Sequence, residues 1–196
     1  LSLKYKDHYF LNAVSNAVRR MSEGEILQIQ KSRELNIDEQ TYLKIISDKT
    51  ASLLSTCSEI GAASVTTDLT QLKLMKDFGE NVGMAFQIRD DVLDYTSRKN
   101  IIGKPIGGDM KEKKITLPLI HSFLQAPKKE ARSILKMIRN GAAGKDVDNI
   151  IAFTQHYGGI QYAVSKAEYY STQARECLKP FPDSPAKAAL LKFVDF

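Results

Sequence analysis

The chain contains no tryptophan, only two cysteines and only three histidines among its 196 residues. Cys57 and Cys177 lie far apart in the sequence, and His8, His121 and His156 are scattered rather than spaced as metal ligands. Because zinc centres need cysteine or histidine ligands at close, regular spacing, we expect none here. Isolated thiols are typical of a reducing compartment, so we expect a cytoplasmic protein.

Long apolar runs are also missing. No segment approaches the roughly 20 apolar residues that a membrane-spanning helix needs, so we expect at most peripheral contact with a membrane. Residues 1–6 lack the apolar stretch and the cleavage site of a signal peptide, and the first residue is leucine rather than methionine. We therefore expect the chain to begin within a longer protein.

The charges are close to balanced, with 28 basic and 23 acidic residues and a net charge of +5. Such a mild excess suits an anionic substrate or a membrane surface as well as a nucleic acid. No basic run is interleaved with aromatic residues, so we expect no nucleic-acid binding. The sequence also lacks the GxGxxG fingerprint of dinucleotide-binding proteins and the GxSxG elbow of hydrolases.

What the sequence does contain is helical periodicity along nearly its whole length, without a convincing alternating strand. The pattern predicts an all-α bundle in which residues 1–196 form a single helical domain. Asp38 is the expected N-cap of the second helix, and Thr116 is expected to cap the helix that starts at Leu117. We expect helices over residues 7–33, 38–62, 69–95, 128–140, 145–157 and 159–178, from 117 onward, and after 185, with residues 96–115 as the longest irregular segment.

The third expected helix ends in an acidic segment, residues 87–95 (QIRDDVLDY). At about 100° per residue, Asp90 and Asp94 fall roughly 40° apart and share one broad face with Gln87 and Asp91. Converging carboxylates suit Mg²⁺, which commonly joins one or two of them to substrate phosphates. The segment therefore predicts Mg²⁺ as a cofactor and the three aspartates as its ligands.

An ordinary solvated acidic face is the alternative explanation of the same segment. A surface helix normally carries charges of both signs on its polar face, whereas this face is almost wholly acidic. Phe86 and Leu93 flank it, as in the wall of a cavity. These neighbours favour the metal site.

A glycine-rich loop with lysines follows the aspartates. Gly103, Gly107 and Gly108 offer backbone N–H groups and Lys104 and Lys114 offer cations, so the loop could close over phosphates. By itself this signal is weak, because glycines often serve only to turn a chain. Its position shortly after the aspartates favours a lid that excludes water from the substrate.

Lys49 is the second unusual residue, because it lies four residues from both Ile45 and Leu53 on an apolar stripe. A lysine there must reach an anion or lose solvation, and Thr50 beside it adds a hydroxyl. The alternative is a surface lysine whose charged end extends to water. A lysine–threonine pair near three carboxylates would complement a metal-bound diphosphate.

The segment before these residues contains a glycine inside a predicted helix. Gly24 costs up to about 1 kcal/mol relative to alanine there, which indicates close helix packing. Glu25 and Gln28 could be buried partners of Lys49, but ordinary structural hydrogen bonding explains them as well.

Several collinear segments, spread over about 95 residues, together resemble the trans-isoprenyl diphosphate synthases of the polyprenyl synthetase family. They are residues 23–28 (EGEILQ), 49–53 (KTASL), 83–94 (GMAFQIRDDVLD), 103–109 (GKPIGGD) and 112–118 (EKKITLP), with a weaker continuation at 157–160. The resemblance implies an antiparallel isoprenoid-synthase helical bundle around a central cavity. It also implies a Mg²⁺-dependent prenyltransferase that condenses isopentenyl diphosphate with an allylic prenyl diphosphate.

The resemblance also implies roles for single residues. Asp90, Asp91 and Asp94 would form the second aspartate-rich motif, with Asp90 binding Mg²⁺ directly and the others partly through water.

Five further residues would act on the allylic diphosphate. Lys49 and Lys104 would contact it and stabilise the leaving group. Gln87 and Thr50 would orient that complex, and Lys114 is a secondary candidate for substrate binding.

Two departures from the family limit the resemblance. Lys113 stands where the family usually has glycine. More seriously, the first aspartate-rich motif and the isopentenyl diphosphate pocket have no counterpart in this sequence. We therefore expect the C-terminal portion of a larger synthase, incomplete for catalysis by itself, whose product length the sequence does not reveal.

Other functions remain open at this point. A non-catalytic regulatory subunit of a heteromeric synthase would show the same segments. A terpene cyclase is disfavoured because the chain lacks a cyclase-like metal triad of Asn, Ser and Glu. By resemblance we expect a homodimer, to which residues 7–33 would contribute.

Overall fold

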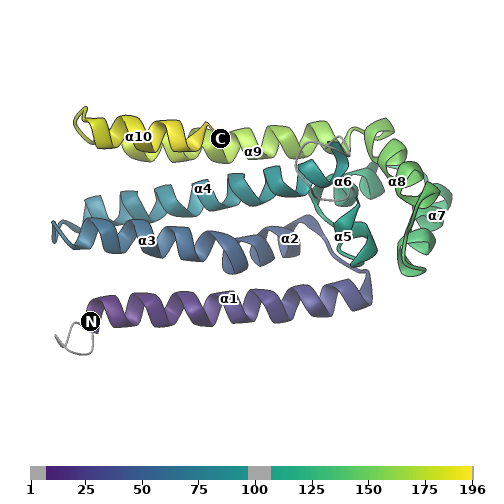
Figure 1. Cartoon of the computed structure of the whole chain (residues 1–196), viewed down its shortest axis with the longest axis horizontal. Helices are drawn as coiled ribbons and strands as arrows, with labels where there is room; N and C mark the ends of the chain where they lie inside the picture. The colour runs from purple at the N-terminus through teal and green to yellow at the C-terminus, as the bar shows by residue number, and fades with distance from the viewer. Residues whose placement is uncertain (1–7, 97–106, 196) are drawn as a thin grey trace. The chain divides into compact units, whose positions relative to one another are not determined.

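The computed structural model describes residues 8–96 and 107–195, and every regular element in these ranges is helical (Figure 1). The predicted all-α class is therefore confirmed. The elements are α1 (His8–Glu34), α2 (Glu39–Ile46), η1 (Ser47–Ala51), α3 (Ser52–Ala63), α4 (Leu69–Thr96), α5 (Gly108–Lys111), α6 (Leu117–Gln125), α7 (Lys128–Arg139), α8 (Lys145–His156), α9 (Gly159–Leu178) and α10 (Pro185–Val194). None of the described helices is both long and apolar enough to cross a bilayer.

Local signals explain most of the helix boundaries. The Asp38 side chain accepts a hydrogen bond from the Thr41 backbone N–H at 2.7 Å, the N-cap that the sequence predicted for α2. Ser184 caps α10 in the same way, accepting from the Lys187 N–H at 3.1 Å. Pro185 then occupies the first turn of α10, where a missing N–H costs nothing.

Three local predictions were wrong. The single helix predicted over residues 38–62 is interrupted by η1, a π-helical turn between α2 and α3. The segment predicted as irregular over residues 96–115 contains the short helix α5. The Thr116 side chain does not cap α6; its hydroxyl lies 3.2 Å from the hydroxyl of Tyr95 in the protein interior.

The described residues form two compact units, and the single domain predicted for residues 1–196 stays a prediction. Unit 1 comprises residues 8–25, 44–87 and 168–195, and unit 2 comprises residues 26–43, 88–96 and 107–167.

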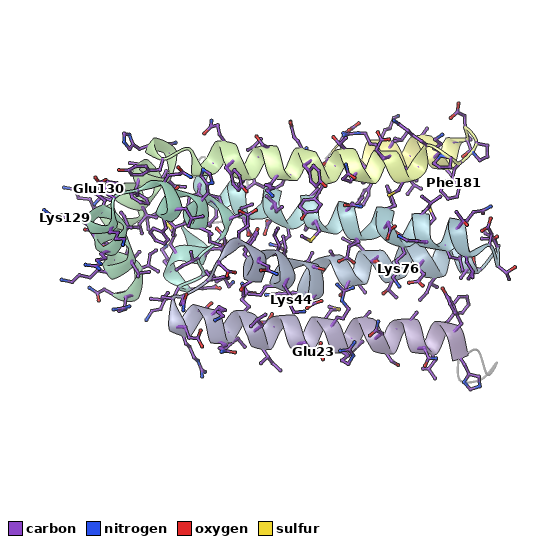
Figure 2. The ribbon with its side chains drawn as sticks, turned by 180° about the vertical axis from the view of Figure 1, so that it is seen from behind. Glu23, Lys44, Lys76, Lys129, Glu130 and Phe181 are labelled. Carbon is purple, nitrogen blue, oxygen red and sulfur yellow. The ribbon has the colours of Figure 1, made fainter. Side chains whose placement is uncertain are left out.

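The core of unit 1 lies between α4, α9 and α10. Phe78 and Val82 of α4 pack with Leu178 of α9 and Val194 of α10, all almost fully buried. Phe181, in the turn between α9 and α10, packs against the same cluster (Figure 2). Burial of large apolar side chains at about 25 cal/mol per Å² is the main stabilising contribution here.

Unit 2 is organised around α8. Both α6 and α7 pack against this helix, and α7 and α8 lie side by side (Figure 1). Ile138 of α7 and Ile150 of α8 are completely buried. In this unit Asp94, near the end of α4, accepts a hydrogen bond from the Gly108 N–H at the start of α5. The acidic residues of the two helices therefore lie close together.

Candidate functional site

The four predicted site residues of the acidic segment all lie on α4. Gln87 belongs to unit 1, and Asp90, Asp91 and Asp94 belong to unit 2. The three carboxylates have different surroundings, which gives them different chemical capacities.

Asp91 faces the interior of unit 2 and is only 5 % exposed. The hydroxyl of Tyr42, on α2, donates a hydrogen bond to its Oδ2 at 2.7 Å. Burial raises the pKa of Tyr42 well above its ordinary value, and the charge of Asp91 raises it further. The tyrosine therefore stays a donor, and it occupies one oxygen of Asp91 inside the protein.

Asp94 holds the start of α5. Its Oδ1 accepts from the Gly108 N–H at 2.9 Å, and its Oδ2 accepts from the Asp109 N–H at 3.2 Å. A carboxylate at a helix N-terminus satisfies N–H groups that have no partner within the helix. The Gly108 N–H, which the sequence suggested as a phosphate donor, is thus directed at Asp94.

Asp109, on α5, is an acidic residue that the site prediction missed. Burial raises its pKa to about 6; the carboxylates of Asp94, Asp90 and Glu112 add to this rise, and Lys114 opposes it. Lys114 Nζ lies 3.7 Å from Asp109 Oδ1 and 2.5 Å from Glu112 Oε2. Asp109 ends the glycine-rich segment of residues 103–109. Its position in the sequence, shortly after the three aspartates of α4, was the signal that could have identified it.

The donor chemistry of this group suits a hard divalent cation. Repelling carboxylates, one with a raised pKa, are stabilised when a cation lies between them. Among residues 8–96 and 107–195, however, no three His, Cys, Asp or Glu side chains are placed to enclose a metal ion by themselves. Mg²⁺ needs only one or two carboxylates when phosphates and water complete its shell.

In unit 1, the two predicted orienting residues contact each other. Thr50 Oγ1 donates to Gln87 Oε1 at 2.8 Å. Lys49 Nζ lies 2.8 Å from Glu25 Oε2 of α1, so this lysine has an acidic partner. Both side chains of that pair are partly exposed, which leaves the lysine accessible to a second anion.

Lys49 and Thr50 both belong to the π-helical turn η1. A π-turn is rare, inserts an extra residue into a helix and is frequently found at functional sites. Asp48, in the same turn, is 6 % exposed. It accepts hydrogen bonds from Arg20 Nε at 2.8 Å and Lys44 Nζ at 2.7 Å.

These hydrogen bonds determine the ionisation of Asp48. Burial by itself would raise its pKa, but the hydrogen bonds from Lys44 and Arg20 outweigh burial and lower it. Arg20 also donates to Ser47 Oγ at 2.8 Å and pairs with Glu80 of α4 at 3.2 Å. The turn is therefore tied to α1 and α4 through one charged network.

Two glycines bring the helix backbones close to the same turn. A Cβ added at Gly24 of α1 would lie 2.9 Å from the Lys49 nitrogen, and one added at Gly83 of α4 would lie 2.4 Å from the Ala51 Cα. The close packing predicted from Gly24 is confirmed. The sequence prediction missed the contribution of Arg20 and Glu80, whose partners lie 28 and 60 residues away along the chain.

The last predicted site residue, Lys104, lies outside the described residues. The structure therefore presents two groups of predicted site residues, one in each unit. In unit 1 it places Lys49, Thr50 and Gln87 together with the charged network of η1. In unit 2 it places the carboxylates of α4 with Asp109 and Lys114 of the α5 region.

Comparison with known proteins gives the class of this fold and site. The family description "Polyprenyl synthetase" matches residues 1–154, and the chain belongs to that family. Its fold and its family are therefore as the sequence segments predicted.

Individual relatives agree with this assignment. The octaprenyl diphosphate synthase of Haemophilus influenzae is 30 % identical over 92 % of this chain and 55 % of its own length. The geranylgeranyl diphosphate synthase of Sulfolobus acidocaldarius is 35 % identical over 86 % of this chain and 52 % of its own length. The chain thus spans little more than half the length of these relatives.

A solved structure matches almost the whole chain. The polyprenyl synthase from Caulobacter crescentus, complexed with calcium and isoprenyl diphosphate, superimposes with a TM-score of 0.90 at 32 % identity. The match covers 99 % of this chain and 60 % of the other.

Proposed function

We propose that this chain is the C-terminal portion of a trans-prenyltransferase. The enzyme would condense isopentenyl diphosphate with an allylic prenyl diphosphate and release pyrophosphate. The carbon–oxygen bond of the allylic diphosphate breaks, the double bond of isopentenyl diphosphate forms the new carbon–carbon bond, and loss of one proton restores a double bond. The membership of residues 1–154 in the polyprenyl synthetase family is the observation that carries this proposal.

In unit 2 the proposal assigns the acidic group to the metal-bound diphosphate. Asp90 would be a direct ligand of Mg²⁺, with Asp94 and Asp91 contributing partly through water. The partly water-mediated role of the other two is supported by their partners, because Tyr42 occupies one oxygen of Asp91 and two backbone N–H groups engage Asp94. When bound, Mg²⁺ would neutralise diphosphate oxygens and lower the barrier to their departure.

In unit 1 the proposal assigns binding and orientation of the diphosphate. Lys49 would exchange part of its interaction with Glu25 for a diphosphate oxygen. The Thr50–Gln87 hydrogen bond would hold both side chains in one orientation, so that little entropy is lost on binding. Lys104 and Lys114 would add positive charge as substrate-binding residues.

The test compares this chain with the same chain joined to its natural upstream sequence. Both are assayed for Mg²⁺-dependent incorporation of labelled isopentenyl diphosphate into geranyl or farnesyl diphosphate. Activity in the longer protein and not in the shorter one is expected. If neither form is active, the catalytic proposal is wrong and the non-catalytic subunit becomes the better explanation; activity that then appears on adding a complete synthase would identify that role.

We further propose a homodimer located in the cytoplasm, to which α1 contributes. Sedimentation equilibrium of the longer protein measures its oligomeric state directly. A monomer at micromolar concentration would contradict it.

A further inference from the structure

Helix α7 carries an unusual concentration of positive charge. It has five basic residues and one acid, a formal charge of +4, where the entire chain carries +5. At about 100° per residue the five cations fall within an arc of roughly 100° along the helix. We call this set the basic stripe: Lys128, Lys129, Arg132, Lys136 and Arg139, all exposed.

The opposite side of the helix is occupied by packing. Ile134 and Ile138 are buried, and α7 packs there against α8. Glu130, the single acid, accepts a hydrogen bond from the Tyr157 hydroxyl at 2.8 Å. Figure 2 shows Lys129 and Glu130 on this helix. Glu130 is thus engaged in a contact within the protein, and the basic stripe is a surface that carries only positive charge.

Within the part of the chain that the structure describes, no carboxylate pairs with any residue of the basic stripe. Some exposed cations elsewhere do have such partners: Arg19 pairs with Glu23 on α1, Lys73 pairs with Asp77 on α4, and Lys179, just after α9, pairs with Glu176. The usual solvated helix face mixes both signs in this way. The basic stripe of α7 does not.

Helix stability explains only part of the basic stripe, because Lys136 and Arg139 lie in the last turn, where cations are favourable. The N-terminal end of a helix carries a partial positive charge, so cations are unfavourable in the first turn. Lys128 and Lys129 are the first two residues of α7. The stability of the helix therefore does not account for their charge.

We propose that the basic stripe docks the protein on an anionic phospholipid bilayer. Each Lys or Arg near such a surface strengthens binding by about fivefold, and the long lysine stems can lie along the interface while their charges meet headgroups.

A lipid surface fits these observations better than a nucleic acid does. Helix α7 contains no aromatic residue that could stack on bases. The inference is independent of the proposed prenyl transfer, because it needs only the charge and exposure of α7. It would place a synthase beside a bilayer that can take up an apolar product.

The test is sedimentation of the protein with large unilamellar vesicles. One set contains phosphatidylcholine alone, and the other contains phosphatidylcholine mixed with phosphatidylglycerol. We expect binding to the mixed vesicles only, weakened by salt because exposed charges are screened. The triple variant Lys129→Gln, Arg132→Gln, Lys136→Gln should lower the partition coefficient by on the order of 100-fold.

A matched control separates a specific surface from net charge. The variant Arg19→Gln, Lys73→Gln, Lys179→Gln also removes one arginine and two lysines, each from a cation that has an acidic partner. It should retain most of the binding, and circular dichroism should show both variants fully helical.

Two results would overturn the proposal. The first is equal loss of binding in both triple variants, which would leave only a net-charge effect. The second is absence of vesicle binding by the unsubstituted protein, with or without salt-dependent binding to duplex DNA. Prenyl-transfer activity is measured separately and does not enter either outcome.

Discussion

Gly24 of α1 lies directly against the backbone of Lys49, since a Cβ at this position would come within 2.9 Å of the Lys49 nitrogen. This contact joins a glycine inside a long helix to the π-helical turn that carries a predicted substrate-binding lysine. The neighbouring atom is main chain, so it cannot move aside as the end of a flexible side chain would. The position of α1 against η1 therefore depends on the missing side chain of Gly24.

Substitution Gly24→Ala tests this contact against helix propensity. Alanine gains up to about 1 kcal/mol over glycine in a helix interior, whereas forcing an extra carbon into a packed contact costs about 1–3 kcal/mol. We expect a net loss in the free energy of unfolding, measured by urea denaturation. Gly61→Ala on α3 is the matched control, because its added Cβ meets nothing within 4 Å and it should stabilise the protein. Equal stabilisation by both substitutions would show that α1 is not held at Gly24.

Substitution Asp48→Asn tests the charged network of η1. It removes the negative partner of Arg20 and Lys44 and should cost about 1–3 kcal/mol of unfolding free energy.

The same substitution predicts a pH dependence with a definite sign. The folded protein holds the pKa of Asp48 below its ordinary value of 3.8, so its contribution is fully present above that value and is lost as pH falls through the folded pKa. The stability difference between the unsubstituted protein and Asp48→Asn should therefore shrink only below about pH 4. If the stability difference between the two proteins stays constant below about pH 4 as well, the charge of the Asp48 carboxylate is unimportant.

Substitution Tyr42→Phe tests the buried hydrogen bond to Asp91. Removing a donor from a buried carboxylate costs about 1–3 kcal/mol, because that oxygen loses its partner without gaining water. Tyr9→Phe is the control, since the Tyr9 hydroxyl donates to Glu59 at 2.8 Å in an exposed setting and its loss should cost under about 0.5 kcal/mol. Urea denaturation measures the free energy of unfolding of both variants. Equal losses would contradict the expectation that the hydrogen bond to Asp91 stabilises the protein more because it is buried.

Substitution Asp90→Asn tests the proposed metal ligand in the longer protein. Turnover should fall by about 100-fold or more, which corresponds to on the order of 3 kcal/mol of activation free energy. Asp77→Asn, on the same helix but paired with Lys73, should leave turnover unchanged. Steady-state rates at several Mg²⁺ concentrations distinguish a lost ligand from a folding defect, and an unaltered rate in Asp90→Asn would reject the metal assignment.

Substitution Lys49→Ala tests diphosphate binding. We expect KM for the allylic substrate to rise more than kcat falls, because the lysine binds the substrate before reaction and only partly stabilises the leaving group. Lys76→Ala is the control. Lys76, labelled in Figure 2, pairs with Glu59, and its substitution should affect neither constant. If both constants are also unaltered in Lys49→Ala, the lysine serves only its ion pair with Glu25.

Much of this protein follows from local sequence. Helix periodicity and caps such as Asp38 act over a few residues, so most helix boundaries could be predicted closely. The acidic segment of α4 and the Lys49–Thr50 pair were recognisable for the same reason, because each is a short run of residues. Gly24 likewise indicates a close helix contact, although the sequence does not identify the contacting residue.

Tertiary structure determines which hydrogen-bond and ion-pair partners those residues have. Nothing near Lys49 in the sequence specifies a π-turn, because the residues that hold the turn, Arg20 and Glu80, lie on other helices. The sequence did not reveal what contacts each aspartate, whereas the structure shows Asp91 bonded to Tyr42 and Asp94 to the start of α5. Charge, burial and hydrogen bonding act through space over a few ångströms, so partners distant along the chain give identical side chains different chemistry.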